Sequence, residues 1–412
     1  MNYNETLDYI HSLGNFGLPA GLHRIKSVLE KLGNPQNEFK SIHIAGTNGK
    51  GSVSCMLSSV FKTAGYKTGT FISPFIIDFR ERIQINGEFI PKDDLVYCAE
   101  KVIETQIELS EFEFITAVAF LYFKLQKIDI LICETGLGGR LDATNTLENL
   151  ICTVITKIGL DHTAILGETL TEIAAEKCGI LRNCPTVTTI YQPKEALDVI
   201  KSKANELYIG DKNSLKILSC DTNGNTFIYK GEKFETALCG EYQIENAVTV
   251  IETVFHSGYN ISYNIICEGI MKAQFPARLE VISKSPLVIL DGAHNPDGAA
   301  VLEKEISKYS NKVTAVVGMM KDKNVQAVLK TLLPYCKACV AVAVPDIPRT
   351  MKKDELCEIA TEYCNCLTAQ NLQDALSKAR TVSEGDPIFI FGSLYLASAI
   401  RPLLFENFKK IK

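Results

Sequence analysis

The feature that most constrains this chain is a short apolar run that ends in a glycine-rich turn and continues as a helix. The run is Ile42–Ala45, the turn reads Gly-Thr-Asn-Gly-Lys-Gly-Ser over 46–52, and apolar residues then recur at helical spacing as far as Phe61. Such a strand, loop and helix is typical of a phosphate-binding loop, because the glycines and the helix start direct backbone N–H groups at one point. Lys50 would supply a cation for the terminal phosphates, and the Ser52 hydroxyl would contact a bound Mg²⁺.

The turn departs from the strict phosphate-loop consensus. Ile44 stands where that consensus has its first glycine, and Gly51 separates Lys50 from Ser52. Glycines alone are weak evidence, since many turns between a strand and a helix need them for positive φ. The coincidence of lysine, hydroxyl, strand and helix favours nucleotide binding, and a purely structural turn is the alternative. The predicted ATP-binding loop residues are Gly46, Thr47, Asn48, Gly49, Lys50, Gly51 and Ser52.

The composition is typical of a globular protein that binds neither nucleic acid nor membranes. A chain of 412 residues with 46% hydrophobic and 22% charged residues suits two globular domains. The net charge of −5 and the lack of a long basic block argue against nucleic acid as a partner. No apolar run reaches the roughly 20 residues that span a bilayer, so no membrane association is expected. The N-terminus does not read as a signal peptide. We therefore expect a cytoplasmic protein, with a monomer as the default.

The fourteen cysteines are expected to be reduced thiols, most of them small buried apolar residues. Cys336 and Cys339 have the CxxC spacing, but they lead into an apolar strand and no second matching pair is present. Zinc or redox chemistry is therefore the minor alternative for this pair, and for Cys364 and Cys366.

Strand and helix patterns alternate along the chain, which predicts an α/β fold with parallel sheets. The expected first domain, 1–282, is an ATP-binding, P-loop NTPase-like parallel sheet flanked by helices, with a helical lead-in interrupted by glycines at 13–18. Residues 186–235 read as shorter strands that form a small antiparallel extension. The second domain, 283–412, is expected to be a smaller Rossmann-like α/β domain. The strands expected in these domains are 42–45, 68–73, 128–134, 151–156, 287–291, 313–318, 338–344 and 388–392, and the main helices are 92–126, 242–256 and 262–273.

Polar side chains follow several of the predicted strands. Ser73, Glu134 and His162 all stand where a parallel strand should end, at the sheet edge where such folds bind ligands. A carboxylate there, beside a phosphate loop, is a natural ligand for Mg²⁺, whereas histidine ligation would make Mn²⁺ plausible as well. Glu134 could instead cap the next segment, and His162 taken alone reads better as an ordinary loop histidine.

Three further segments allow two interpretations each. The glycines of 136–145 could serve only a tight turn. Lys177 lies in the last turn of an amphipathic helix, where lysine usually just complements the helix dipole. Asp291 and His294 follow a strand at a loop that leads into a helix, where an Asn or Asp cap is the structural alternative.

Together these segments resemble the folylpolyglutamate synthase/dihydrofolate synthase family, a branch of the Mur ligase superfamily. The resemblance rests on motifs that keep the family's order from about residue 20 to 300. They are 22–25, 46–52, 73–74, 81–83, 136–145, 174–177, 275–280 and 291–296.

The resemblance implies roles for individual residues. Ser52, Ser73, Glu134 and His162 would bind Mg²⁺, of which two ions are expected, and Lys177 would carry a carbamate that serves a metal site. The catalytic residues would be Lys50, Lys177 and His162. Besides the loop, ATP would be contacted by Asn246, Arg278, Asp291 and His294. Residues 74–83, with Arg82, match a mobile loop near the folate, and Asp142 and Ala143 match part of a pteroate pocket.

The implied reaction joins L-glutamate to a reduced folate, with ATP split to ADP and phosphate through an acyl phosphate. Dihydropteroate could be a second substrate. Since an acyl phosphate hydrolyses readily, closure of the two domains is expected. The alternatives are a Mur-type ligase that acts on a cell-wall precursor and a P-loop regulatory ATPase.

Overall fold

The computed structural model describes residues 1–14, 21–309, 312–345 and 347–408. They form two compact units, which are described separately. The first unit contains 1–219, 225–237 and 243–274, and the second contains 220–224, 238–242 and 275–412. Most of the predicted interruption at 13–18 lies outside the described residues. The long last segment of the second unit starts at Phe275, and its strand at 280–284 pairs inside the second sheet.

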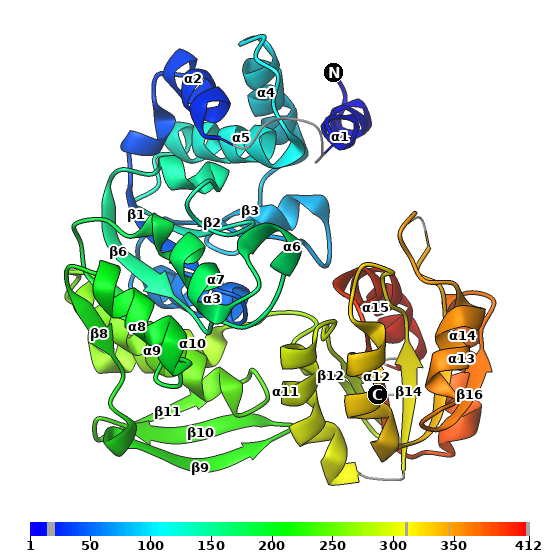
Figure 1. The fold of residues 1–412 in the computed structure, drawn as a ribbon. Coiled ribbons are helices and arrows are strands. Elements are labelled where there is room, and N and C mark those ends of the chain that lie inside the picture. The colour runs from blue at the N-terminus through cyan, green and yellow to red at the C-terminus, as the bar shows by residue number, and fades with distance from the viewer. Residues whose placement is uncertain (15–20, 310–311, 346, 409–412) are drawn as a thin grey trace. The chain divides into compact units, whose positions relative to one another are not determined.

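The first unit is built on an eight-stranded sheet in the order β4-β3-β2-β5-β1-β6-β7-β8 (Figure 1). Six strands are parallel, of which β1, β2, β5 and β6 match the prediction, and β3 and β4 are antiparallel to their neighbours. The strands are β1 (Lys40–Ala45), β2 (Thr68–Phe71), β3 (Ile83–Ile85), β4 (Glu88–Phe89), β5 (Ile130–Glu134), β6 (Leu150–Ile155), β7 (Thr186–Thr188) and β8 (Leu207–Ile209).

Helices cover both faces of this sheet. Figure 1 shows α4 and α5 on one side of β1, β2 and β3, and α3 on the other. Leu131 and Cys133 alternate with Ile130 and Ile132 along β5, and the first two join the core under α5. The helices are α1 (Tyr3–Ser12), α2 (His23–Lys31), α3 (Lys50–Thr63), α4 (Lys92–Ile103), α5 (Glu111–Leu125), α6 (Thr163–Leu166), α7 (Leu170–Lys177), α8 (Lys194–Lys203), α9 (Tyr242–His256) and α10 (Tyr263–Lys272).

Local sequence explains several boundaries. Capping boxes start α5, at Ser110 and Glu113, and α7, at Thr169 and Glu172. Asn86 and Gly87 both have positive φ, 53° and 79°, as the two-residue turn between β3 and β4 requires. The described 3₁₀ turns are η1 (Pro35–Asn37), η2 (Phe79–Arg82), η3 (Ala143–Thr146), η4 (Cys178–Ile180), η5 (Lys212–Ser214), η6 (Ser307–Tyr309) and η7 (Leu333–Tyr335).

The predicted extension at 186–235 is partly wrong. Its second half forms a three-stranded sheet of β9 (Leu215–Asp221), β10 (Gly224–Tyr229) and β11 (Glu232–Thr236), with β10 and β11 antiparallel as expected. Its first half contributes β7 and β8 to the main parallel sheet, with α8 between them. Ala196 and Ile200, one helical turn apart, bury the inner face of α8.

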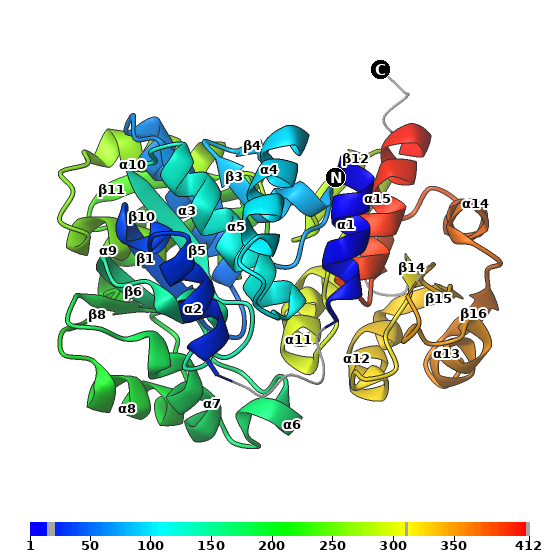
Figure 2. The same cartoon turned by 90° about the horizontal axis from the view of Figure 1, so that it is seen from above.

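The second unit is a smaller α/β layer structure with strand order β12-β13-β17-β14-β15-β16, in which only β12 is antiparallel. In Figure 2, α11, α12 and α13 lie on one side of β14, β15 and β16, and α14 and α15 on the other. The strands are β12 (Glu280–Lys284), β13 (Leu287–Leu290), β14 (Val313–Val317), β15 (Cys336–Ala341), β16 (Asn365–Thr368) and β17 (Ile388–Phe391); the helices are α11 (Pro296–Ile306), α12 (Val325–Leu332), α13 (Lys353–Ala360), α14 (Leu372–Ser383) and α15 (Leu394–Phe408).

Gly269 allows α10 to pack closely on α3, the helix that follows the glycine loop. A Cβ at this position would lie 2.5 Å from Val60 Cα, and the Ser59 hydroxyl donates to the Gly269 carbonyl at 2.6 Å. We expect Gly269→Ala to lower the free energy of unfolding by about 1–3 kcal/mol, because two backbones must move apart. Asn264→Ala, on the exposed side of α10, should change it by less than about 0.5 kcal/mol. Urea midpoints measure both, and equal midpoints would contradict the packing described.

Candidate functional site

The topology of the first sheet brings the predicted site segments to one edge. β1 lies between β5 and β6, and β2 lies next to β5. Because all four strands are parallel, their carboxyl ends meet, and with them the segments that follow. These segments are the glycine loop after β1, Ser73 after β2, Glu134 at the end of β5, and 157–162 after β6.

The glycine loop is held in shape by the segment after β6. The amides of Thr47 and Asn48 donate to the Lys157 carbonyl at 2.9 and 3.1 Å, and the Thr47 hydroxyl donates to the Gly159 carbonyl at 3.0 Å. Gly49 has φ 93°, and a Cβ there would lie 2.5 Å from the Asn246 side-chain oxygen. The loop is therefore preformed, and glycine at 49 is required both by backbone conformation and by space.

Lys50 and Glu134 meet beside this loop. Lys50 Nζ donates to the Thr47 carbonyl at 3.3 Å and lies 3.9 Å from Glu134 Oε1. The Ser73 amide donates to Glu134 Oε2 at 3.4 Å, and the Glu134 side chain is only 5% exposed. A cation and a carboxylate thus share the mouth of the loop, as a site for a metal-bound triphosphate requires. Glu134 does not cap a helix, because the segment that follows β5 is a turn.

Lys177 is the least expected member of this group. Its Nζ is buried and donates to the Gly46 carbonyl at 2.8 Å, so the last turn of α7 is tied to the start of the glycine loop. Burial and, to a smaller extent, the positive charge of Lys50 together lower the pKa of Lys177 from its ordinary value of 10.5 to about 7. The carboxylates of Asp161, Asp142 and Glu134 act in the opposite direction. A lysine that only complements the helix dipole would be exposed to solvent. Since Lys177 is buried, that interpretation of it is wrong.

Gln243 is a site residue that the sequence analysis missed. It is fully buried on α9, where its amide donates to the Ser52 hydroxyl at 3.2 Å. The Asn246 amide, one turn later, donates to the Gln243 side-chain oxygen at 2.9 Å. Asn246 therefore lies beside the glycine loop, and its contact with the adenine side of ATP stays a prediction. The available signal was a pair of amides at helical spacing in an otherwise apolar helix.

Three of the four predicted metal ligands offer oxygen atoms, which Mg²⁺ prefers. Within the described ranges, no three His, Cys, Asp or Glu side chains are grouped so that they could hold a metal by themselves. One buried carboxylate, Glu134, and the hydroxyls of Ser52 and Ser73 nevertheless suit Mg²⁺, which usually takes one or two protein oxygens and completes its shell with phosphates and water. These residues fit a nucleotide-bound Mg²⁺ better than a metal site made only of protein.

His162 is more exposed than the buried Glu134. It precedes α6 with φ 51°, its side chain is 47% exposed, and its Nε2 lies 4.0 Å from Asp161 Oδ2. Its amide donates to Asp161 Oδ1 at 2.9 Å. Metal binding by His162 stays a prediction.

The segment 136–145 is a tightly packed turn. The Asp142 carboxylate accepts hydrogen bonds from the Leu137 amide at 2.8 Å and the Thr144 amide at 3.0 Å. Burial raises the pKa of Asp142, although these hydrogen bonds lower it. A Cβ at Gly139 would lie 2.7 Å from the Lys177 carbonyl oxygen. The segment thus packs against the end of α7, and its glycines are explained by close approach. Asp142 and Ala143 are buried, and contact between them and a substrate stays a prediction.

Arg82 is enclosed by aromatic rings. Its guanidinium lies 5.4 Å from the ring centre of Phe75 and 5.3 Å from that of Phe79, and its Nη2 lies 3.8 Å from Glu111 Oε1. Its side chain is mostly buried, which fixes the direction of the charge.

In the second unit, Asp291 organises the loop after β13. Its carboxylate accepts from the amides of Leu279 and Ala293, each at 2.7 Å. Burial raises the pKa of Asp291, whereas the charge of Arg278 lowers it. His294 Nδ1 lies 2.8 Å from the Gly292 carbonyl, and Asn295 caps α11 by accepting from the Gly298 amide at 2.7 Å. The predicted helix cap is therefore present and is made by Asn295. ATP contact by Asp291 and His294 stays a prediction.

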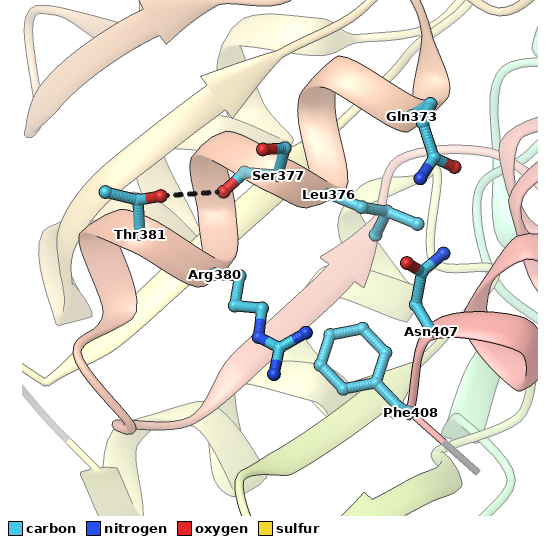
Figure 3. Close-up of a pocket in the computed structure, with 7 residues that line it drawn as sticks. All are labelled: Gln373, Leu376, Ser377, Arg380, Thr381, Asn407 and Phe408. Carbon is cyan, nitrogen blue, oxygen red and sulfur yellow. Dashed lines mark hydrogen bonds between the residues drawn. The ribbon is translucent and has the colours of Figure 1, made fainter. Parts of the chain in front are cut away.

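A pocket in the second unit is lined by none of the site residues described above. It has a volume of about 200 Å³ and is lined by α14 and the end of α15 (Figure 3). The Thr381 hydroxyl in its wall donates to the Ser377 carbonyl at 3.1 Å, and Arg380 is its one charged residue. None of the predicted site residues lines it, so it does not contribute to the candidate site.

Comparisons with known proteins agree with this geometry. Residues 44–254 match the family model "Mur ligase middle domain", and 278–403 match "Dihydrofolate synthetase, C-terminal domain". The chain is 37% identical to the dihydrofolate synthase/folylpolyglutamate synthase of Bacillus subtilis, over 98% of this chain and 99% of that one.

Two solved structures show the same fold. One is a folylpolyglutamate synthase of Mycobacterium tuberculosis complexed with ADP, with a TM-score of 0.89 and 28% identity over 98% of each chain. The other is a bifunctional folylpolyglutamate synthase/dihydrofolate synthase with Mn, AMPPNP and L-glutamate bound, with a TM-score of 0.85 and 29% identity over 98% of each chain. No helix in the described ranges has the length and apolar character needed to cross a membrane.

The lowered pKa of Lys177 predicts a pH-dependent stability. Between pH 7 and 10.5 the unfolded chain holds a proton on this lysine that the folded chain has lost, so the contribution of Lys177 to stability rises with pH across that window. Lys177→Met should therefore be most stabilised relative to the parent near pH 6, and this advantage should shrink as the pH approaches 10. Unfolding midpoints in buffer free of CO₂ measure it, with Lys201→Met on exposed α8 as control. A difference that does not change with pH would contradict the buried, uncharged lysine.

Proposed function

The chain belongs to the folylpolyglutamate synthase/dihydrofolate synthase family, and from this premise we propose that it adds L-glutamate to a reduced folate while ATP is split to ADP and phosphate. It is an ATP-dependent ligase that forms carbon–nitrogen bonds. The observation that carries the proposal is the meeting of Lys50, Glu134 and Lys177 at one preformed glycine loop. The comparisons support this function rather than a cell-wall ligase or a regulatory ATPase.

The chemistry explains why such a loop is needed. A carboxylate is a poor electrophile towards an amine at neutral pH. Transfer of the γ-phosphoryl group to the folate carboxylate gives an acyl phosphate, and attack by the glutamate amine then releases phosphate and forms the amide. Two anions must approach one another in the first step, and Lys50 and the loop amides offset their repulsion. Mg²⁺, held by Ser52, Ser73, Glu134 and His162, would neutralise phosphate charge when bound; we propose two such ions.

A carbamate on Lys177 forms a second part of the proposal. A lysine with a pKa of about 7 is about half in the neutral form at pH 7, and only that form combines with CO₂. The product is a carbamate and a released proton, so a buried cation becomes an anion. That anion would lie close to Lys50, whose charge disfavours an ammonium at this position and favours an anion. The burial and the low pKa support the modification.

The remaining predicted contacts complete the proposal. Asn246 contacts ATP on the adenine side, and Arg278, Asp291 and His294 contact ATP from the second unit. Arg82 contacts the folate, and its guanidinium, which Phe75 and Phe79 hold in place, suits a carboxylate.

Asp142 and Ala143 belong to the pteroate side. The family's bifunctional members make dihydropteroate a further candidate substrate, and the enzyme is proposed to act as a monomer. Parallel assays of dihydropteroate and tetrahydrofolate with labelled glutamate decide between one activity and two.

ADP release tests the function directly. We expect release to depend on the simultaneous presence of glutamate and a reduced folate, because the acyl phosphate is formed only on bound folate and is consumed by the amine. ADP release at an equal rate without either acceptor would support a regulatory ATPase instead. Release that is stimulated by cell-wall precursors but not by folates would support the Mur-type ligase.

Lys50→Ala should reduce turnover by about 10²–10³-fold or more, because a preorganised charge at the transferring phosphoryl group is lost. Lys62→Ala, on the exposed last turn of the same helix, should leave turnover unchanged. Steady-state ADP release measures both, and circular dichroism checks the fold. Near-normal turnover of the Lys50 variant would contradict the role of the loop.

Lys177→Ala should also lose activity, and short-chain carboxylates should restore part of it by occupying the space of the carbamate. Rates are measured with and without added acetate or propionate. The same additions to Lys50→Ala serve as the control, since a carboxylate cannot replace a cation. A mass spectrum of the active enzyme that shows only an unmodified amine at Lys177 would count against the carbamate.

A further inference from the structure

Five cysteines of the second unit gather in one part of its core. They belong to the cluster between the sheet and helices α11, α12 and α13. Two are buried and three are partly exposed at the edge of that cluster. The five are Cys336, Cys339, Cys357, Cys364 and Cys366. The sequence predicts Cys336, Cys339, Cys364 and Cys366 mainly as small apolar residues, with zinc or redox chemistry as the minor alternative.

Strand register brings two of them side by side. Cys339 of β15 is the direct partner of Cys366 on the neighbouring parallel strand β16, so both side chains leave the same face of the sheet. β16 is the last strand of this sheet, which leaves Cys366 partly exposed, whereas Cys339 is fully buried. Helix α13 contacts both strands, and both views show it beside β16 (Figures 1 and 2).

Cys357 lies on α13, which contacts both strands, and it packs against the same core cluster as Cys339 and Cys366. Hydrogen bonds from the Cys339 and Cys357 thiols lower the pKa of Cys366 to about 7, although burial opposes this. Burial and the Cys366 sulfur raise the pKa of Cys357 to about 12, and Asp354 on the same helix adds to this. All fourteen cysteines are described, and Cys366 alone has a lowered pKa among those with a resolved shift. Cys366 therefore lies at the sheet edge beside two thiols of higher pKa, and in the structure its Sγ donates to the Leu367 carbonyl at 3.7 Å.

We propose that Cys366 is a peroxide-reactive thiol and that its oxidation ends in a disulfide with Cys357, which links α13 to the edge strand β16. The oxidant is a hydroperoxide. The Cys366 thiolate attacks one peroxide oxygen, the O–O bond breaks, and Cys366 sulfenic acid and hydroxide result. The Cys357 sulfur then attacks the sulfenic sulfur, its proton leaves with the departing hydroxyl as water, and the S–S bond forms. Together the two thiols lose two electrons and two protons, and the peroxide gains them, so that hydrogen peroxide ends as two molecules of water.

Cys357 is a better partner than Cys339 for two reasons. Direct partners on parallel strands keep their Cβ atoms near the strand spacing of about 4.8 Å, which exceeds the roughly 3.5–4.5 Å that a disulfide needs. A helix residue that faces the sheet can approach more closely. Cys357 is also partly exposed, so hydroxide and water can leave.

The first readout is the reactivity of the full-length, reduced protein. At pH 7 a thiol of pKa 7 is about half ionised, against ~1% for a thiol of pKa 9, and its lower nucleophilicity removes part of that advantage. We expect Cys366 to be alkylated about 5–10-fold faster than Cys364, the partly exposed cysteine two positions earlier. Equal rates for the two would overturn the proposal.

The second readout is the product after brief treatment with hydrogen peroxide and trapping with N-ethylmaleimide. Cleavage after Lys353 and Glu358 separates Cys357 from the peptide that holds Cys364 and Cys366. Mass spectrometry should then find the two peptides joined, with Cys364 alkylated. A disulfide between Cys364 and Cys366, or a linkage to Cys339, would overturn the assignment of the partner.

Variants separate the roles of the two thiols. Cys357→Ser should leave a sulfenic acid on Cys366 that dimedone labels, with at least a tenfold loss of disulfide. Cys366→Ser should lose both products, and the matched control Cys364→Ser should lose neither. Because the reactivity assay uses the unaltered chain, the proposal stays testable even if a variant folds poorly. Disulfide formation at the parental rate in Cys357→Ser would refute it.

Discussion

The hydrogen bond from Lys177 to the Gly46 carbonyl is the contact on which the rest of the site depends. It ties the end of α7 to the point where β1 becomes the glycine loop, at 2.8 Å in a buried setting. From the neighbouring segment, the Lys157 carbonyl accepts the amides of Thr47 and Asn48. The loop is thereby fixed by its own fold before any nucleotide arrives, which lowers the cost of binding in the competent geometry.

This arrangement carries a cost in stability. An ammonium group is placed where burial and the charge of Lys50 both oppose it. Shifted pKa values of this kind are common at functional sites, because a group whose pKa lies near 7 can gain or lose a proton at physiological pH. Loss of the charge through carbamate formation would remove the repulsion from Lys50 and replace it with attraction. The burial of Lys177 near Lys50 therefore explains both the cost in stability and the proposed carbamate formation.

Much of this could be read from the sequence, for physical reasons. The glycine loop and the parallel strands follow from local patterns, and the convergence of Ser73 and Glu134 follows from the rule that parallel strands end at one edge. The low pKa of Lys177 could not be read in this way, because it arises from burial between segments far apart in the chain. The role of Gln243 and the thiol group around Cys366 were missed for the same reason: helix packing and strand register create both. Helix α8 was missed because short strands and a short helix have similar apolar spacing over a few residues.

The proposed reaction requires that the terminal phosphates of ATP are held by the amides of the glycine loop together with Lys50. A crystal structure with a non-hydrolysable ATP analogue and magnesium would show where these phosphates bind. We expect phosphate oxygens within hydrogen-bonding distance of the amides of residues 48–52 and of Lys50 Nζ, with the metal beside Glu134. A nucleotide bound elsewhere on the chain, with this loop free of phosphate, would contradict this expectation.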